Sequence, residues 1–130
     1  MKKLFSIILL MFVMLTSATS AFAAPPDVFI TTPSSTSELN PSVYSVQPPI
    51  VWDQYDADSL YFKEYWIIIY DPSYNVIYDS GIVGQYQSAT HKSVNVPTLP
   101  TNRTLLVTVN VSDSNDEWSN TQAKWMRISP

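Results

Sequence analysis

An alternation of apolar and mostly polar residues over positions 105–112 constrains the fold of this chain more than any other feature. Leu105, Val107, Val109 and Val111 stand at every second position, which in an extended strand places them on one face. From Ala24 onward, no stretch of about ten residues has apolar side chains at helical spacing, and similar alternation recurs between clusters of Pro, Asn, Asp and Ser. The sequence therefore predicts an all-β domain.

The alternation and the turn signals together predict seven strands. These cover residues 28–31, 50–53, 62–71, 76–78, 93–96, 105–112 and 123–128. Residues 24–49 hold the first strand and a Ser- and Pro-rich irregular segment, and residues 50–130 form the remainder of a single domain. Asp79-Ser80-Gly81 is expected to end the fourth strand, with Gly81 at positive φ. Seven strands in about 100 residues are typical of an immunoglobulin-like antiparallel β-sandwich.

Residues 1–23 have the three parts of a secretory signal peptide. Lys2 and Lys3 precede an apolar run over residues 4–15, and Ala21-Phe22-Ala23 supplies a cleavage site. A membrane-spanning helix would need about 20 apolar residues, and this run stops at Thr16-Ser17. We therefore expect cleavage before Ala24 and secretion from a bacterium, rather than a retained membrane anchor.

Composition narrows the function further. The chain has no cysteine, so neither disulfides nor lipid attachment to a cysteine is available, and stability must come from core packing. Because Lys2 and Lys3 leave with the signal, 5 of the 7 basic residues remain against 11 acidic ones, a net charge of −6. This charge argues against binding to nucleic acid or to anionic lipid and is typical of a soluble secreted surface.

The order of several short motifs resembles bacterial fibronectin type III domains. The motifs are Ile50-Val51-Trp52-Asp53, Glu64-Tyr65 followed by Ile67 and Ile69, Val76-Ile77-Tyr78-Asp79-Ser80-Gly81, Val96-Pro97-Thr98-Leu99, the alternating segment up to Asp113, and Trp118-Ser119. The resemblance covers nearly the whole chain from Ile50 onward. Many members place a tyrosine at the position of Leu105, whose hydrogen bond to the backbone a leucine cannot make. The resemblance implies a seven-stranded sandwich that serves as a spacer or adhesion module of secreted proteins and is not itself a catalyst.

Few residues suit catalysis or metal binding. The only histidine, His91, lies in a polar stretch that predicts a surface loop, and one histidine does not make a zinc site. Asp53, Asp56 and Asp58 are candidate calcium ligands or a candidate catalytic pair, although turn aspartates that bond their own backbone have the same pattern. A second acidic turn contains Asp113, Asp116 and Glu117, and both turns are expected at the same end of the sandwich.

The aromatic residues are the most informative for binding. In the segment 65–70, both faces of one strand are apolar, whereas a sandwich strand needs only one apolar face. If Tyr65, Ile67 and Ile69 point inward, then Trp66, Ile68 and Tyr70 form an outward stripe. This stripe either binds a partner or covers neighbouring side chains such as Leu106 by cross-strand packing.

We therefore expect a secreted, extracellular, non-catalytic module without a cofactor. Its expected activity is protein–protein interaction with another secreted or surface protein through Trp66, Ile68 and Tyr70. One alternative is binding of a polysaccharide or the cell wall through exposed aromatic rings, and a more remote one is hydrolysis by a carboxylate pair. No nucleic-acid partner is expected, and the cleaved chain is not expected to be an integral membrane protein.

Overall fold

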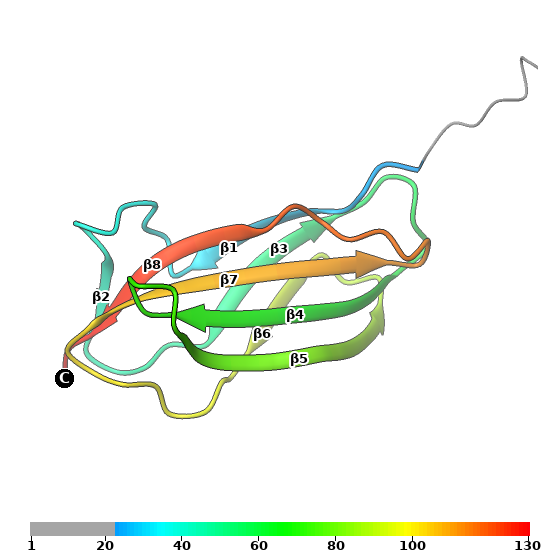
Figure 1. Cartoon of the computed structure of the whole chain (residues 1–130). Helices are drawn as coiled ribbons and strands as arrows, with labels where there is room; N and C mark the ends of the chain where they lie inside the picture. The colour runs from blue at the N-terminus through cyan, green and yellow to red at the C-terminus, as the bar shows by residue number, and fades with distance from the viewer. Residues whose placement is uncertain (1–22) are drawn as a thin grey trace, which may run out of the picture.

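The structure is a computed structural model that describes residues 23–130, which form eight β-strands in two sheets (Figure 1). The strands are β1 (Asp27–Thr32), β2 (Ser42–Tyr44), β3 (Ile50–Tyr55), β4 (Phe62–Tyr70), β5 (Val76–Gln87), β6 (His91–Val94), β7 (Thr104–Asp113) and β8 (Gln122–Ile128). One sheet has the order β1-β3-β6 and the other β2-β8-β7-β4-β5. The described residues include no helix, which confirms the all-β prediction.

No membrane-spanning helix is found in residues 23–130. Nearly all of the predicted signal peptide, residues 1–22, lies outside the described residues.

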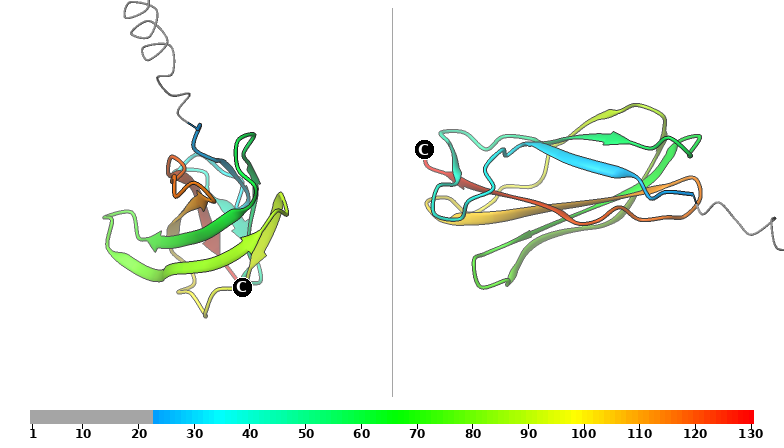
Figure 2. Two further views of the ribbon diagram at one scale, coloured as in Figure 1. Left: turned by 90° about the vertical axis from the view of Figure 1, so that its right-hand side faces the viewer. Right: turned by 90° about the horizontal axis from the view of Figure 1, so that it is seen from above.

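The alternating segment forms the centre of the core, as its pattern predicts. Leu105, Val107, Val109 and Val111 on β7 are all 0% exposed. They belong to one hydrophobic cluster with residues of both sheets, including Val28, Ile30, Ile50, Trp52, Tyr65, Ile67, Ile69, Met126 and Ile128. Burial of each such aliphatic side chain contributes about 1.5 to 3 kcal/mol. The two sheets therefore cover a common core, and the end view in Figure 2 shows how the strands of the two sheets are arranged.

Three expectations about the strands are wrong. First, β2 forms within the segment predicted to be irregular; it pairs in parallel with β8, whereas the other paired strands are antiparallel. Second, β5 does not end at Asp79-Ser80-Gly81 but continues to Gln87. The strand continues because the Ser80 hydroxyl accepts the hydrogen bond of the Ile67 N–H at 2.8 Å, while Gly81 takes the predicted positive φ of 64°. Third, His91 is not in a loop but is the first residue of β6.

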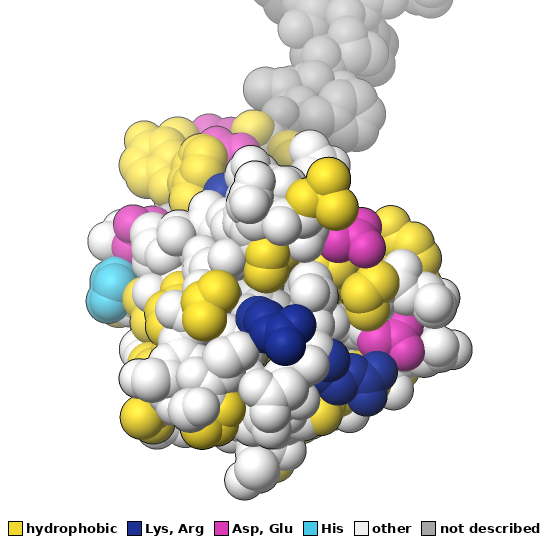
Figure 3. Space-filling view, turned by 90° about the vertical axis from the view of Figure 1, so that its left-hand side faces the viewer, with side chains coloured by type: hydrophobic (Ala, Val, Ile, Leu, Met, Phe, Trp, Pro, Cys, Tyr) yellow, Lys and Arg dark blue, Asp and Glu magenta, His cyan; other side chains and the backbone are white. Residues whose placement is uncertain are grey.

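The turns gather at two opposite ends of the molecule (Figures 1 and 2). The β3–β4 loop and the β7–β8 turn share one end with the first described residues. The β4–β5 turn and the C-terminus lie at the other end, which Figure 3 views directly. There, Arg127 pairs with Thr104 in the β7–β8 register, beside Arg103, and Lys and Arg side chains lie near the centre of the view.

Candidate binding surface

The two faces of β4 separate as the sequence predicts. Tyr65, Ile67 and Ile69 are buried in the core, and Tyr65 packs its ring edge-to-face against Trp52 at 5.3 Å. The alternate residues Trp66, Ile68 and Tyr70 lie on the outer face of the five-stranded sheet and are only partly buried. The predicted stripe therefore exists as a row of side chains along the middle of this face.

Cross-strand register places further apolar residues beside the row. Tyr70 pairs with Leu106 on β7, and Leu106 pairs with Trp125 on β8. Leu106 faces outward but is only 6% exposed, since the larger side chains on both sides cover it. Part of the stripe therefore acts in cross-strand packing, one of the two explanations that the sequence left open.

On the other side of the row, β5 contributes two exposed aliphatic residues. Ile82 pairs with Trp66 and Val76 pairs with Tyr70, and these two β5 side chains are 55% and 57% exposed. The sequence did not single them out, because the predicted break at residues 79–81 removed Ile82 from the strand. With them, the apolar surface spans β5, β4, β7 and β8, and we call these residues the outer apolar face: Trp66, Ile68, Tyr70, Val76, Ile82, Leu106 and Trp125.

Two aromatic rings of this face, those of Trp66 and Tyr70, have contacts that hold them in place. The Trp66 indole N–H donates to Asp79 Oδ1 at 2.7 Å, and the Gly81 N–H donates to the same oxygen at 2.8 Å. The hydrogen bond from the Trp66 indole has the larger effect, and together with that from the Gly81 N–H it holds the pKa of the Asp79 carboxyl below its usual range. At the end of the row, the rings of Tyr70 and Tyr74 meet edge-to-face at 6.2 Å. The face is therefore built before any partner binds.

The acidic residues of the first turn make different contacts. Asp53 lies on β3 and contacts His91 Nδ1 at 2.8 Å, an exposed pair across the β3–β6 register. Asp58 Oδ2 accepts a hydrogen bond from the Ala24 N–H at 2.9 Å. Asp53, Asp56 and Asp58 thus have separate partners, and residues 23–130 contain no group of three side chains suited to hold a metal ion.

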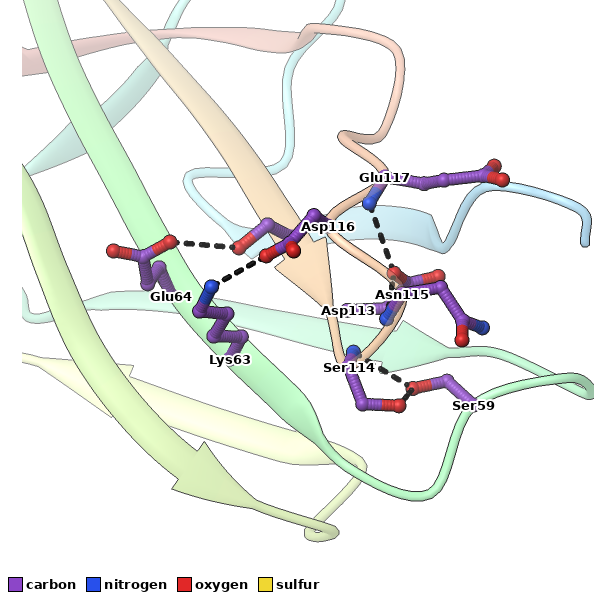
Figure 4. A network of polar contacts seen from close by, with 9 residues as sticks. Ser59, Lys63, Glu64, Asp113, Ser114, Asn115, Asp116 and Glu117 are labelled. Carbon is purple, nitrogen blue, oxygen red and sulfur yellow. Dashed lines mark hydrogen bonds and ion pairs between the residues drawn. The ribbon is translucent and has the colours of Figure 1, made fainter.

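The two acidic turns do meet at one end, as their strand assignment predicts. The Ser114 N–H donates to the Tyr61 carbonyl at 3.0 Å, and the hydroxyls of Ser59 and Ser114 lie 2.8 Å apart (Figure 4). Lys63 forms an ion pair with Asp116, and the Glu117 carboxylate points away from the turn. Asp56 and Asp113 lie where these two turns meet, and a hydrogen bond to the Asp113 carboxyl is one of the causes that raise the pKa of Asp56.

A second aromatic feature lies beside this end. A shallow hollow of about 560 Å³ is lined by Leu60, Tyr61, Tyr86, Gln87 and Ser88. The Tyr61 and Tyr86 rings lie 6.2 Å apart at 40°, and Tyr86 has a positive φ of 42°, which is uncommon for a bulky residue. The Tyr86 ring also occupies the space that a side chain at Gly84 would need, since a Cβ there would meet Tyr86 Cε2 at 2.7 Å.

Comparisons with known proteins give little beyond this geometry. The sequence matches no protein family model and no curated protein. Among solved structures, the chain is similar to the Clostridium perfringens spore cortex lytic enzyme SleM, with 14% identity and a TM-score of 0.38. The match covers 67% of this chain and 28% of that enzyme's chain, so this chain spans under a third of that protein's length.

Proposed function

We propose that residues 24–130 form a secreted bacterial fibronectin type III-like sandwich that binds another secreted or surface protein through the outer apolar face and catalyses no reaction. The strand order supports the fold. In an immunoglobulin-like sandwich, the third, sixth and seventh strands share one sheet, and the first, second and fifth strands share the other. With β2 counted as an added edge strand, these sets correspond to β4, β7 and β8 and to β1, β3 and β6.

The extent of the outer apolar face, which is interrupted on β5 only by Asp79, is the observation that carries the binding proposal. Single exposed apolar residues are normal on a protein surface, whereas a contiguous apolar patch marks an interaction site. Here Val76 and Ile82 extend the central row to the β5 edge and remain more than half exposed. Cross-strand packing explains the burial of Leu106 but gives no reason for exposing two further aliphatic side chains beside it.

The chemistry of the face favours a protein partner over a sugar. Its most exposed members, Val76 and Ile82, are aliphatic, and Trp66 already uses its indole N–H on Asp79. Asp79, which pairs with Ile68 between Val76 and Ile82, is the one charged residue of this part of the face, and its carboxylate is held by the Trp66 indole. An aliphatic patch with fixed aromatic rings suits the apolar centre of a protein interface.

Site-specific crosslinking tests this proposal. A photo-crosslinking amino acid at Ile82 should join the protein to one partner in the culture supernatant, whereas the same group at Phe29 should not. Phe29 is a matched control because it is 59% exposed on the other sheet. The substitutions Val76→Lys and Ile82→Lys should weaken binding of the identified partner at least tenfold, since each places a charge in an apolar interface. Equal crosslinking from both positions, or unchanged affinity, would contradict the proposal.

Polysaccharide binding is the second candidate, and the hollow between Tyr61 and Tyr86 favours it. Exposed tyrosines offer a flat apolar ring together with a polar hydroxyl, and Gln87 and Ser88 add hydrogen-bonding groups. Tyr61→Ala with Tyr86→Ala should then release the protein from insoluble cell-wall polysaccharide, while Val76→Lys should not. The reverse result would assign retention to the outer apolar face.

The places of the carboxylates support a non-catalytic role. A hydrolytic pair must face substrate in a cleft, about 5 to 10 Å apart. Asp113 is 0% exposed, and Asp53 is already paired with His91. A measured glycosidase activity abolished by Asp53→Asn or Asp56→Asn would overturn this part of the proposal.

A further inference from the structure

Asp56 and Asp113 bring two carboxyl groups together where the β3–β4 loop meets the β7–β8 turn. Each aspartate uses Oδ1 to hold its own loop. Asp56 Oδ1 accepts the Asp58 N–H at 2.9 Å. Asp113 Oδ1 accepts the N–H groups of Asn115 and Glu117 at 2.9 and 3.0 Å (Figure 4).

The second oxygen of each carboxyl group has no such donor. Oδ2 of Asp56 and Oδ2 of Asp113 are both buried, and no described residue donates a hydrogen bond to either. Asp113 as a whole is 0% exposed. An ionised carboxylate only accepts hydrogen bonds, so two ionised groups in this position would repel each other and leave both oxygens unsatisfied. A protonated carboxyl carries an O–H donor, and one proton would satisfy both oxygens.

No neighbouring basic group among the described residues takes the place of this shared proton. None of the ion pairs among residues 23–130 includes Asp56 or Asp113. The charged groups on the adjoining elements are Asp58 on the β3–β4 loop, Lys63 and Glu64 on β4, and Asp116 and Glu117 on the β7–β8 turn, together with the α-amino group that cleavage before Ala24 would create. Lys63 is paired with Asp116, and the Ala24 nitrogen is bonded to Asp58 Oδ2, so neither is paired with Asp56 or Asp113. Burial, followed by the hydrogen bond to the Asp113 carboxyl, raises the pKa of Asp56 to about 6.

We propose that Asp56 and Asp113 share one proton, which joins the β3–β4 loop to the β7–β8 turn in mildly acidic solution and is lost near neutral pH. The Ser59, Tyr61 and Ser114 contacts remain when the proton leaves, so the loops loosen rather than separate. The device acts at the end of the domain that carries Tyr61, and Asp56 also lines a small pocket with Ser59, Leu60 and Tyr61. A change of pH thereby alters the shape of the surface beside the aromatic hollow.

The sign of the pH dependence follows from linkage. The unfolded chain releases the proton of Asp56 near pH 3.8, whereas the folded chain keeps it to about pH 6. The folded state therefore binds more protons in this window, and the free energy of unfolding falls as the pH rises through it. Most carboxylates have the opposite effect on stability.

Thermal unfolding of the purified protein between pH 4.5 and 7.5 tests the shared proton. Asp56→Asn places a permanent N–H donor against Asp113 Oδ2 and keeps the Oδ1 acceptor for the Asp58 N–H. At pH 7.5 this variant should have a Tm about 4 to 8 °C above that of the unmodified protein, and its Tm should vary less with pH. Asp58→Asn is the matched control, because it removes the same charge from the same loop and should keep most of the pH slope, since the Asp58 charge is the smallest of the causes that raise the pKa of Asp56. His91 is unchanged in both variants.

Two further measurements can overturn the proposal. In an NMR titration of the unmodified protein, one carboxyl of the pair should titrate near pH 6; if both carboxyls titrate below pH 4.5, no proton is shared. If 5 mM CaCl₂ raises the Tm of the unmodified protein at pH 7.5 but not that of Asp56→Asn, a metal cation occupies the site and the proposal is wrong. An unaltered pH slope in Asp56→Asn would overturn it as well.

Discussion

The chain builds the same aspartate turn twice, over residues 71–75 at one end of the molecule and over residues 113–117 at the other. In both, the first N–H donates to the fifth carbonyl and the fourth N–H to the first carbonyl, at 3.0 Å in one turn and 3.1 Å in the other. In both, Oδ1 of the aspartate accepts the third and fifth N–H groups at 2.9 and 3.0 Å. The fourth residues, Tyr74 and Asp116, have φ angles of 62° and 61°.

The turns differ in burial and in the groups around Oδ2 of the aspartate. Asp71 Oδ2 accepts the Asn75 side-chain amide at 3.0 Å and lies 3.5 Å from the Arg103 guanidinium, and the pKa of Asp71 is lowered, chiefly by Asn75. Asp113 Oδ2 is buried and receives no hydrogen bond from the described residues, and the neighbouring Asp56 has a raised pKa. Turn geometry is therefore the same in both places, while the charge state of the aspartate depends on whether a donor or another carboxyl group lies beside it.

Removing each turn aspartate should give the largest effect. In Asp113→Ala, two partly buried N–H groups lose their acceptor, so we expect a loss of about 1 to 3 kcal/mol in the free energy of unfolding. In Asp71→Ala the freed N–H groups are exposed to water, so the loss should be smaller. Urea unfolding at pH 5 measures both, because the negative charge of Asp56 is then largely absent. A greater loss in Asp71→Ala would mean that burial does not distinguish the two turns.

Asparagine at the same two positions should have opposite effects at pH 7.5. Asp113→Asn keeps the Oδ1 acceptor and directs an amide N–H at Asp56 Oδ2, which should raise the free energy of unfolding by about 1 kcal/mol. Asp71→Asn directs the same amide at two donors, Asn75 and Arg103, and should lower the urea midpoint. Effects of the same sign in both variants would show that Oδ2 is not the source of the difference.

Much of the fold was predictable from local sequence, but the contrast between the turns was not. The alternation at 105–112 predicted the core face of β7, and the turn residues predicted where β4 and β7 end. Residues 72–75 and 113–117 fall in segments predicted to turn, whereas Asp71 was placed at the end of the preceding strand. Asn75 is local to its turn, but Arg103 and Asp56 come from distant loops, and no local pattern encodes their places beside Asp71 and Asp113.

Ile82 and strand β2 were not predicted, and the reason in both cases is a contact between distant parts of the chain. Ile82 was lost from the candidate surface because Asp79-Ser80-Gly81 contains residues that end strands. A hydroxyl can replace a backbone carbonyl in the ladder, and Ser80 does so for Ile67. The three-residue strand β2 was missed because its pairing with β8 is a tertiary contact.

The loss of stability at acid pH should depend on the turn that contains Asp71. A carboxyl with a lowered folded-state pKa contributes stability above its usual range, and this stability is lost as the pH falls. Asn75→Ala removes the main donor to Asp71, so its Tm should fall less between pH 5 and 2.5 than that of the unmodified protein. Glu117→Ala changes the same position of the other turn and is the matched control. An equal fall in Tm between pH 5 and 2.5 in Asn75→Ala and in the unmodified protein would contradict this account.

The smallest expected effect is that of Arg103→Gln. The guanidinium lies 3.5 Å from Asp71 on a side chain that is 46% exposed, and exposed ion pairs are weak and screened by salt. In an NMR titration, the pKa of Asp71 should therefore rise less in Arg103→Gln than in Asn75→Ala, and this rise should disappear in 1 M NaCl. A rise as large as that of Asn75→Ala that persists in salt would contradict this, because the charge state of Asp71 would then be set by a neighbouring loop. The charge states of both turn aspartates would in that case depend on residues of other loops, and the turns would differ only in whether that residue is a base or an acid.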